Sequence, residues 1–108
     1  MREAGLVTIE RRTSELHVAR QLFKHDNFIH FRIYASVRRL PKVLVLRDCI
    51  YGLDIQTQPP YSCWFNDKHV RDFPNWKTAF EILTERVNTV SRQFGFERVY
   101  LKQWEAEE

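Results

Sequence analysis

The sequence predicts an α+β fold: one antiparallel β-sheet of about four to five strands, with an N-terminal helix and a long C-terminal-half helix packed on one face. Two observations favour it: apolar side chains alternate along residues 29–37, and an apolar stripe of helical period runs along residues 76–94. Strands and helices do not alternate regularly, which argues against a parallel sheet. The 108 residues fit a single domain, 1–108.

The first elements in this order are a short strand and a helix. Residues 6–11 suit a strand, and Thr13 or Ser14 suits the N-cap of a helix. Leu16, Ala19, Leu22 and Phe23 then follow at helical spacing. The pattern predicts a helix from about Ser14 to Lys24, ended by a turn at Asp26-Asn27.

The clearest strand pattern covers residues 29–37. One set of alternating side chains is apolar, and the other is polar: Ile29, Phe31, Ile33, Ala35 and Val37 against His30, Arg32, Tyr34, Ser36 and Arg38. Because successive side chains of a strand point to opposite faces, we expect the first set in the core and the second on the other face.

Three further strands are expected before the long helix. Residues 42–47 read as a central strand, residues 50–56 as a strand with Tyr51, Leu53 and Ile55 alternating, and residues 61–65 as a short one. Gly52 indicates a bulge or a close backbone approach. Asn66-Asp67 ends the short strand.

The strongest helix signal starts after Asp72-Phe73-Pro74-Asn75, where Asp72 or Asn75 can serve as N-cap. The stripe expected to face the core consists of Trp76, Ala79, Phe80, Leu83, Val87, Val90 and Phe94. Gly95 sits where a left-handed C-terminal residue belongs, with Phe96 after it. A last strand is expected over residues 98–104.

Composition indicates a small intracellular domain. No apolar run approaches the roughly 20 residues that span a bilayer, so no membrane partner is expected. With only Cys49 and Cys63, a disulfide framework is excluded, a cytoplasmic setting is the default, and both thiols are expected to be small buried groups, although a pairing between them stays open.

Charge is unevenly distributed along the chain, whose net charge is +3. Residues 1–48 hold ten Lys and Arg and five acids, giving +5, whereas residues 49–108 hold seven and nine, giving −2. Most early cations are arginines, which suit forked contacts to phosphate or carboxylate.

Motifs of catalysis are missing from the sequence. It contains no phosphate-cradling glycine loop, no nucleophile-elbow motif, and no close pair of metal ligands of the kind that zinc sites repeat. We therefore expect no enzyme activity, no cofactor and no metal.

The leading functional hypothesis is a non-catalytic nucleic-acid-binding domain. It would use a basic and aromatic sheet face, in which cations meet phosphates and rings stack on bases. The candidate residues are His30, Arg32, Tyr34, Arg38, Arg39, Arg47, Arg98, Tyr100 and Lys102. An ordinary solvated sheet face would have a similar composition.

The alternative is a small adaptor or inhibitor, of viral or mobile-element type, that binds a protein partner. It would dock through the same face or through exposed aromatic and arginine residues near the Pro-Pro loop, namely Tyr61, Trp64, Arg71 and Phe73, which are types that dominate interface energies. The sequence leaves the oligomeric state open.

Overall fold

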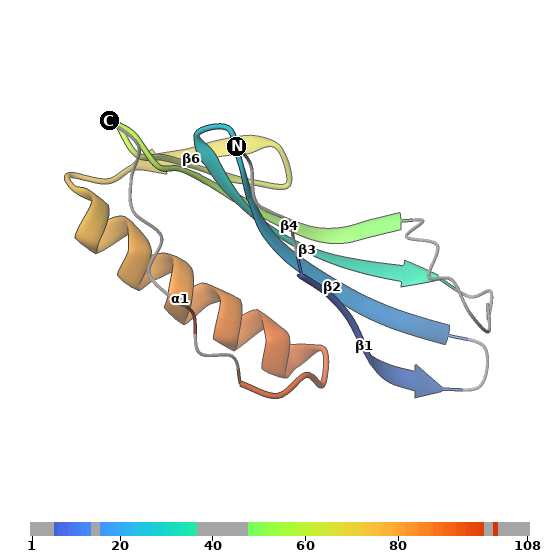
Figure 1. Cartoon of the computed structure of the whole chain (residues 1–108). Coiled ribbons are helices and arrows are strands. Elements are labelled where there is room, and N and C mark those ends of the chain that lie inside the picture. The colour runs from blue at the N-terminus through green and yellow to red at the C-terminus, as the bar shows by residue number, and fades with distance from the viewer. Residues whose placement is uncertain (1–5, 14–15, 37–47, 99–100, 102–108) are drawn as a thin grey trace.

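The computed structural model describes residues 6–13, 16–36, 48–98 and 101. They form a six-stranded antiparallel sheet with one helix crossing one face (Figure 1). The predicted α+β class, with one antiparallel sheet and the long C-terminal-half helix on one face, is confirmed. The N-terminal helix is not observed.

The strands follow one another in the sheet in chain order, so every neighbouring pair is a hairpin or a simple antiparallel connection. They are β1 (Leu6–Thr13), β2 (Leu16–His25), β3 (Phe28–Ser36), β4 (Asp48–Gln56), β5 (Ser62–Phe65) and β6 (Lys68–Asp72), followed by helix α1 (Trp76–Gln93). The predicted strand at residues 42–47 lies outside the described residues. Of the predicted strand at residues 98–104, only Arg98 and Leu101 are described, and neither is in a strand.

The prediction of a helix over about Ser14 to Lys24 is wrong, because residues 16–25 form β2 between β1 and β3. The strand alternation is hard to see because the side facing α1 carries Val18, then Arg20, then Leu22. Arg20 is nevertheless accommodated there: its guanidinium donates to Ser91 Oγ at 3.3 Å and lies over the Phe96 ring. Pairing on both sides outweighs the weak helical spacing.

The core lies between α1 and the sheet, as the alternation in residues 29–37 predicts. Ile29, Phe31 and Ile33 are completely buried and pair with Ile55, Leu53 and Tyr51 of β4. Of the predicted helix stripe, Ala79, Leu83, Val87 and Val90 are buried, and Trp76, Phe80 and Phe94 pack at the edge of the cluster.

Helix α1 begins and ends where the capping residues of the sequence predict. The Asn75 side chain accepts a hydrogen bond from the Thr78 amide at 2.9 Å, which makes Asn75 the N-cap. At the other end Gly95 has a φ of 89°, and the Phe96 amide donates to the Ser91 carbonyl at 2.8 Å. This pattern is a Schellman motif, and it requires the left-handed residue that glycine supplies.

Besides the irregularity of β1 between Ile9 and Arg11, β4 and β6 each contain a β-bulge. Pairing passes from Ile33–Tyr51 to Tyr34–Cys49 and skips Ile50 of β4. In edge strand β6 it likewise skips Val70. Ile50 and Val70 are 41% and 55% exposed, because the extra residue of a bulge leaves the alternation of its strand. A bulge also makes β6 a poor template for an added strand.

The turn at Asn66-Asp67 ends one strand and begins another. Both residues have positive φ, 49° and 70°, which is typical of the two-residue turn that joins hairpin strands. The turn therefore connects β5 to β6, a strand that sequence analysis did not predict.

Both cysteines are free, so the pairing that was left open does not occur. Cys63 is buried, as expected, whereas Cys49 is exposed near the start of β4, where the strand projects beyond the core. In the part of the chain that the structure describes, no helix is long and apolar enough to cross a bilayer.

Candidate binding surface on the open sheet face

The sheet face opposite α1, here termed the open face, carries the polar set of β3. His30, Arg32 and Tyr34 alternate with the buried Ile29, Phe31 and Ile33, so they point away from the helix. The predicted alternation of β3 is confirmed from Ile29 to Tyr34, but it does not continue, because Ala35 is half-buried and Ser36 is buried. None of the described elements packs on the open face (Figure 1).

A row of ring side chains crosses the open face and is termed the ring row: Phe23, His30, Phe28, Trp64 and His69. Each ring contacts the next, from β2 through β3 and β5 to β6. Phe23 and His30 stack at 4.7 Å between centroids, Phe28 meets Trp64 edge-on at 5.6 Å, and Trp64 meets His69 at 5.4 Å. Such offset and edge contacts hold the rings in fixed positions.

Next to the ring row, Asp54 of β4 binds two cationic or polar partners on β3. His30 Nδ1 lies 2.6 Å from Asp54 Oδ1. Arg32 lies against both carboxylate oxygens, with Nη1 2.8 Å from Oδ1 and Nη2 donating to Oδ2 at 3.2 Å. A forked arginine–carboxylate pair of this kind is among the stronger and more directional ion pairs.

The electrostatics of this cluster favour the charged forms of Asp54 and Arg32. Burial of Asp54 raises its pKa, but hydrogen bonds from His30 and Arg32 together with their charges outweigh that effect and bring the pKa below its ordinary value. Burial lowers the pKa of Arg32, and Asp54 more than compensates, so its pKa is raised. Arg32 therefore stays charged, and its charge is matched by Asp54.

Gly52 allows Arg32 to lie flat on the sheet. It faces Arg32 across β3 and β4, and a Cβ at position 52 would lie 3.0 Å from Arg32 Nη1. Of the two roles predicted for Gly52, the close approach is what the structure shows, while the bulge of β4 lies nearby at Ile50.

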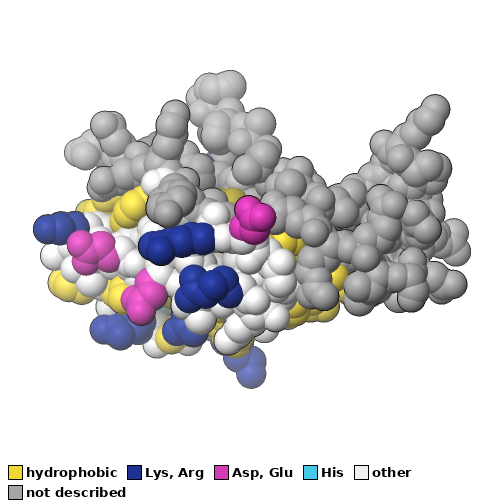
Figure 2. All heavy atoms as spheres, turned by 90° about the horizontal axis from the view of Figure 1, so that it is seen from below, with side chains coloured by type: hydrophobic (Ala, Val, Ile, Leu, Met, Phe, Trp, Pro, Cys, Tyr) yellow, Lys and Arg dark blue, Asp and Glu magenta, His cyan; other side chains and the backbone are white. Residues whose placement is uncertain are grey.

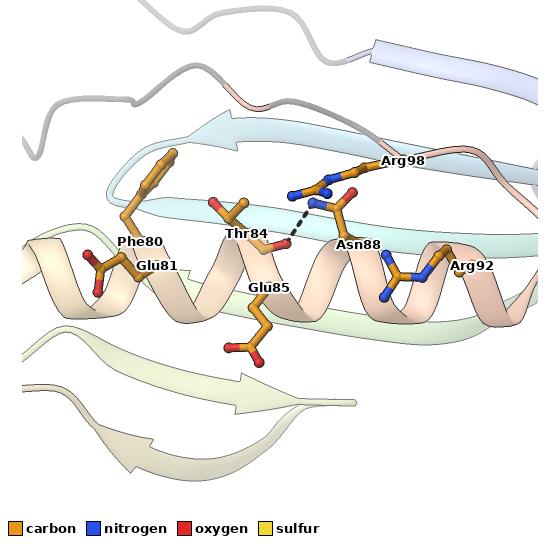
Figure 3. Close-up of a pocket in the computed structure, with 7 residues that line it drawn as sticks. All are labelled: Phe80, Glu81, Thr84, Glu85, Asn88, Arg92 and Arg98. Carbon is orange, nitrogen blue, oxygen red and sulfur yellow. Dashed lines mark hydrogen bonds between the residues drawn. The ribbon is translucent and has the colours of Figure 1, made fainter.

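The residues predicted to bind nucleic acid do not all share this face. Arg98 lies on the helix side, where it lines a pocket with Arg92, Glu85 and other α1 residues (Figure 3). His30, Arg32 and Tyr34 are on the opposite side of the sheet. The remaining predicted residues lie outside the described part of the chain: Arg38, Arg39, Arg47, Tyr100 and Lys102.

The residues predicted for protein binding are divided between the two faces. Trp64 belongs to the ring row, whereas Tyr61 packs against Trp76 at the start of α1. Arg71 is exposed on the helix side with its guanidinium over the Phe73 ring, and Phe73 itself is 5% exposed and part of the core. These four residues therefore do not form one surface.

Sequence reasoning missed Phe23, Phe28, Asp54 and His69 as parts of this surface. Phe23 falls in the predicted helix, and Phe28 lies between the predicted turn at Asp26-Asn27 and the predicted strand that starts at Ile29. Asp54 alternates with Leu53 and Ile55, so its position on the polar side of β4 was readable. Its pairing with Arg32 was not readable, because it depends on the register between β3 and β4.

Charged side chains on the helix side are mixed in sign. Figure 2 shows lysine and arginine side chains interspersed with acidic ones on that face, without a large patch of one sign among the described residues. On the open face of β2 to β6, as far as these strands are described, Arg32 is the only lysine or arginine. Within the same residues, no three His, Cys, Asp or Glu side chains gather closely enough to hold a metal ion.

Comparison with known proteins gave no match: no family model, no curated protein and no solved structure matches this chain.

Proposed function

We propose that this chain is a protein-binding domain that docks a partner through the ring row of its open face. The observation that carries the proposal is the continuous row of five contacting rings, from Phe23 on β2 to His69 on β6. It represents the alternative of the two functions that the sequence suggested. Of the two docking surfaces that this alternative left open, it takes the sheet face rather than the Pro-Pro loop.

The ring row has the chemistry of an interface centre. Tryptophan, tyrosine and arginine carry most of the energy in measured interfaces, and rings supply contact area with few rotatable bonds to immobilise. Phe23, Phe28 and Trp64 are only partly buried, so a partner could cover further apolar surface. Gln56, which is half-buried beside the rings, offers a polar group for the rim.

A protein partner fits this face better than nucleic acid because the charge is balanced. Nucleic-acid binding gains most of its affinity from cations that replace the counterions of phosphates. Arg32 is engaged with Asp54, and a phosphate there would compete with that carboxylate. Binding of nucleic acid remains a prediction that relies on Arg38, Arg39 and Arg47, and it is an outcome of the test.

The test uses photo-crosslinking in cells of the chain's natural source. A benzophenone amino acid replaces Trp64 on the open face or, as control, the exposed Lys77 on α1. We expect one polypeptide to crosslink at position 64 and not at position 77, with nuclease treatment making no difference. With that polypeptide purified, Trp64→Ala should weaken binding by about 30-fold, as for a hot-spot residue, whereas the surface control Glu81→Ala should leave affinity unchanged.

A salt titration with single- and double-stranded oligonucleotides runs in parallel. If the wild type binds them more tightly than about 10⁻⁴ M at physiological salt, and if Arg32→Ala lowers the salt dependence while Tyr34→Ala weakens binding without changing it, nucleic acid is the ligand and the proposal fails. Equal crosslinking at positions 64 and 77 would also overturn it.

A further inference from the structure

A second surface lies on the other side of the sheet, between α1 and β4–β6. A groove of about 310 Å³ runs there, separate from the open face. Its floor and walls are apolar: Tyr51, Leu53, Ile55, Cys63, Phe65, Val70, Phe73 and Ile82. Burial raises the pKa of the Cys63 thiol, so at neutral pH this part of the floor carries no charge.

The groove exposes apolar surface that a monomer usually covers. Phe65 is 40% exposed and Val70 55%, two of the three large apolar side chains most exposed in the described chain. Val70 lines the groove because the bulge of β6 places it on the same side as Arg71. Apolar patches edged by polar groups commonly mark binding sites.

Two arginines stand at the rim of the groove, Arg71 from β6 and Arg86 from α1. Neither has a carboxylate partner among the described residues. Arg71 lies over the Phe73 ring at 5.0 Å, and Arg86 hydrogen-bonds Tyr51. Neither contact is with an anion, so no described residue compensates the positive charge of either guanidinium. An apolar groove with two uncompensated cations is complementary to a ligand that has an apolar body and an anionic head.

We propose that this groove binds a small apolar carboxylate of about ten non-hydrogen atoms. The size follows from the volume, at about 30 Å³ for each water-sized group. The carboxylate lies between Arg71 and Arg86, and the hydrocarbon body covers Phe65, Val70 and the floor. An eight-carbon straight-chain acid has this number of atoms.

The test is a titration of the full-length chain, labelled on Ile, Leu and Val methyl groups, with octanoate and followed by NMR. Shifts should concentrate at Leu53, Ile55, Val70 and Ile82, leaving Val18, Ile33 and Val90 in place, with a dissociation constant of about 1 mM or tighter. Butyrate should bind at least about tenfold more weakly because it buries fewer methylenes. 1-Octanol should also bind more weakly, since it lacks the charge.

Charge-removing variants test the role of the rim. Arg71→Gln and Arg86→Gln should each weaken octanoate binding by about two- to fivefold, as expected for exposed ion pairs. Arg92→Gln, the same change on the other flank of α1, should have no effect. Equal binding of octanoate and 1-octanol, shifts spread over the whole core, or unchanged affinity in both rim variants would overturn the proposal.

A further titration, with a peptide, distinguishes a free acid from a carboxylate on a protein. An acidic peptide with one phenylalanine is titrated under the same conditions. If the peptide shifts the groove methyls at lower concentration than octanoate, the groove is a docking site for acidic protein segments and the assignment to a free acid is wrong. If octanoate is the tighter ligand, the assignment stands.

Discussion

Asp54 determines the charge that the open face presents, because its carboxylate is bound to both His30 and Arg32. The side chain is nearly buried, with 11% of its surface exposed. A buried carboxylate is stable only while its partners compensate for lost hydration. Asp54 therefore links the stability of the sheet to the properties of the candidate interface.

The first prediction concerns Asp54→Asn. Removing the charge leaves Arg32 without its counterion, and we expect a loss of about 1–3 kcal/mol in unfolding free energy at pH 7. Because the folded pKa of Asp54 is lowered, its contribution is present above its unfolded pKa of about 3.9 and is lost as pH falls through the folded value. Lowering the pH below about 4 should therefore reduce the unfolding free energy of the variant by less than that of the wild type.

Urea denaturation at several pH values measures this difference. Glu81→Gln, an exposed site on α1 with the same chemical change, should alter stability at pH 7 by no more than about 0.5 kcal/mol. Parallel pH curves for wild type and Asp54→Asn would contradict the pairing.

The second prediction concerns Gly52→Ala. The new Cβ would push Arg32 away from Asp54, since it would lie 3.0 Å from Arg32 Nη1. We expect a loss of about 1–2 kcal/mol in the wild type. In an Arg32→Ala background the same change should be neutral or stabilising, because alanine then suits a strand better than glycine.

A double-mutant cycle of Gly52→Ala and Arg32→Ala, followed by chemical denaturation, measures the coupling between the two positions. Additive effects would show that Arg32 does not lie over Gly52 in solution.

At the scale of elements, the sequence pattern agrees with the structure in α1 but not in β2. The apolar stripe of α1 is long and is bounded by Asn75 and Gly95, so periodicity and caps agree. In β2 half of the ten residues are apolar, but they do not alternate along the strand, and Arg20 occupies the core side. Its conformation is decided by pairing with β1 and β3 rather than by its own pattern.

The third prediction tests the contribution of α1 to the core. Leu83 is fully buried against the sheet, so Leu83→Ala should lower the unfolding free energy by about 2–5 kcal/mol. Glu85→Ala, on the exposed side of the same helix, serves as control and should change it by about 0.5 kcal/mol or less. A loss below about 1 kcal/mol for Leu83→Ala would mean that the helix is peripheral to the core.

Among the residues that the structure describes, one helix covers one face of the sheet and leaves the other face open (Figure 1). Because the strands are connected in order, each pairs with its neighbour in sequence, and the sheet forms without crossover connections. The apolar side of the sheet, however, depends on α1 for its cover.

The fourth prediction follows from that dependence. A chain that ends at Asn75 should fail to unfold cooperatively on heating and should bind a hydrophobic dye, because Phe31, Ile33 and Ile55 would lose their cover. Circular dichroism melting and dye fluorescence, with the complete chain as reference, provide the measurement. A sharp melting transition in the shortened chain would show that the sheet has a core independent of α1.

The sequence by itself determined the α+β class, the alternation of β3 and the limits of α1, because these depend on local periodicity and on caps built from adjacent residues. It also placed His30, Arg32 and Tyr34 on one face. Tertiary structure alone decided that residues 16–25 are a strand, that Asp54 pairs with Arg32, and that five rings join into one row. Those features depend on the register between strands, which brings together residues as distant in the sequence as Phe23 and His69. The register cannot be predicted from the residue pattern of any one segment.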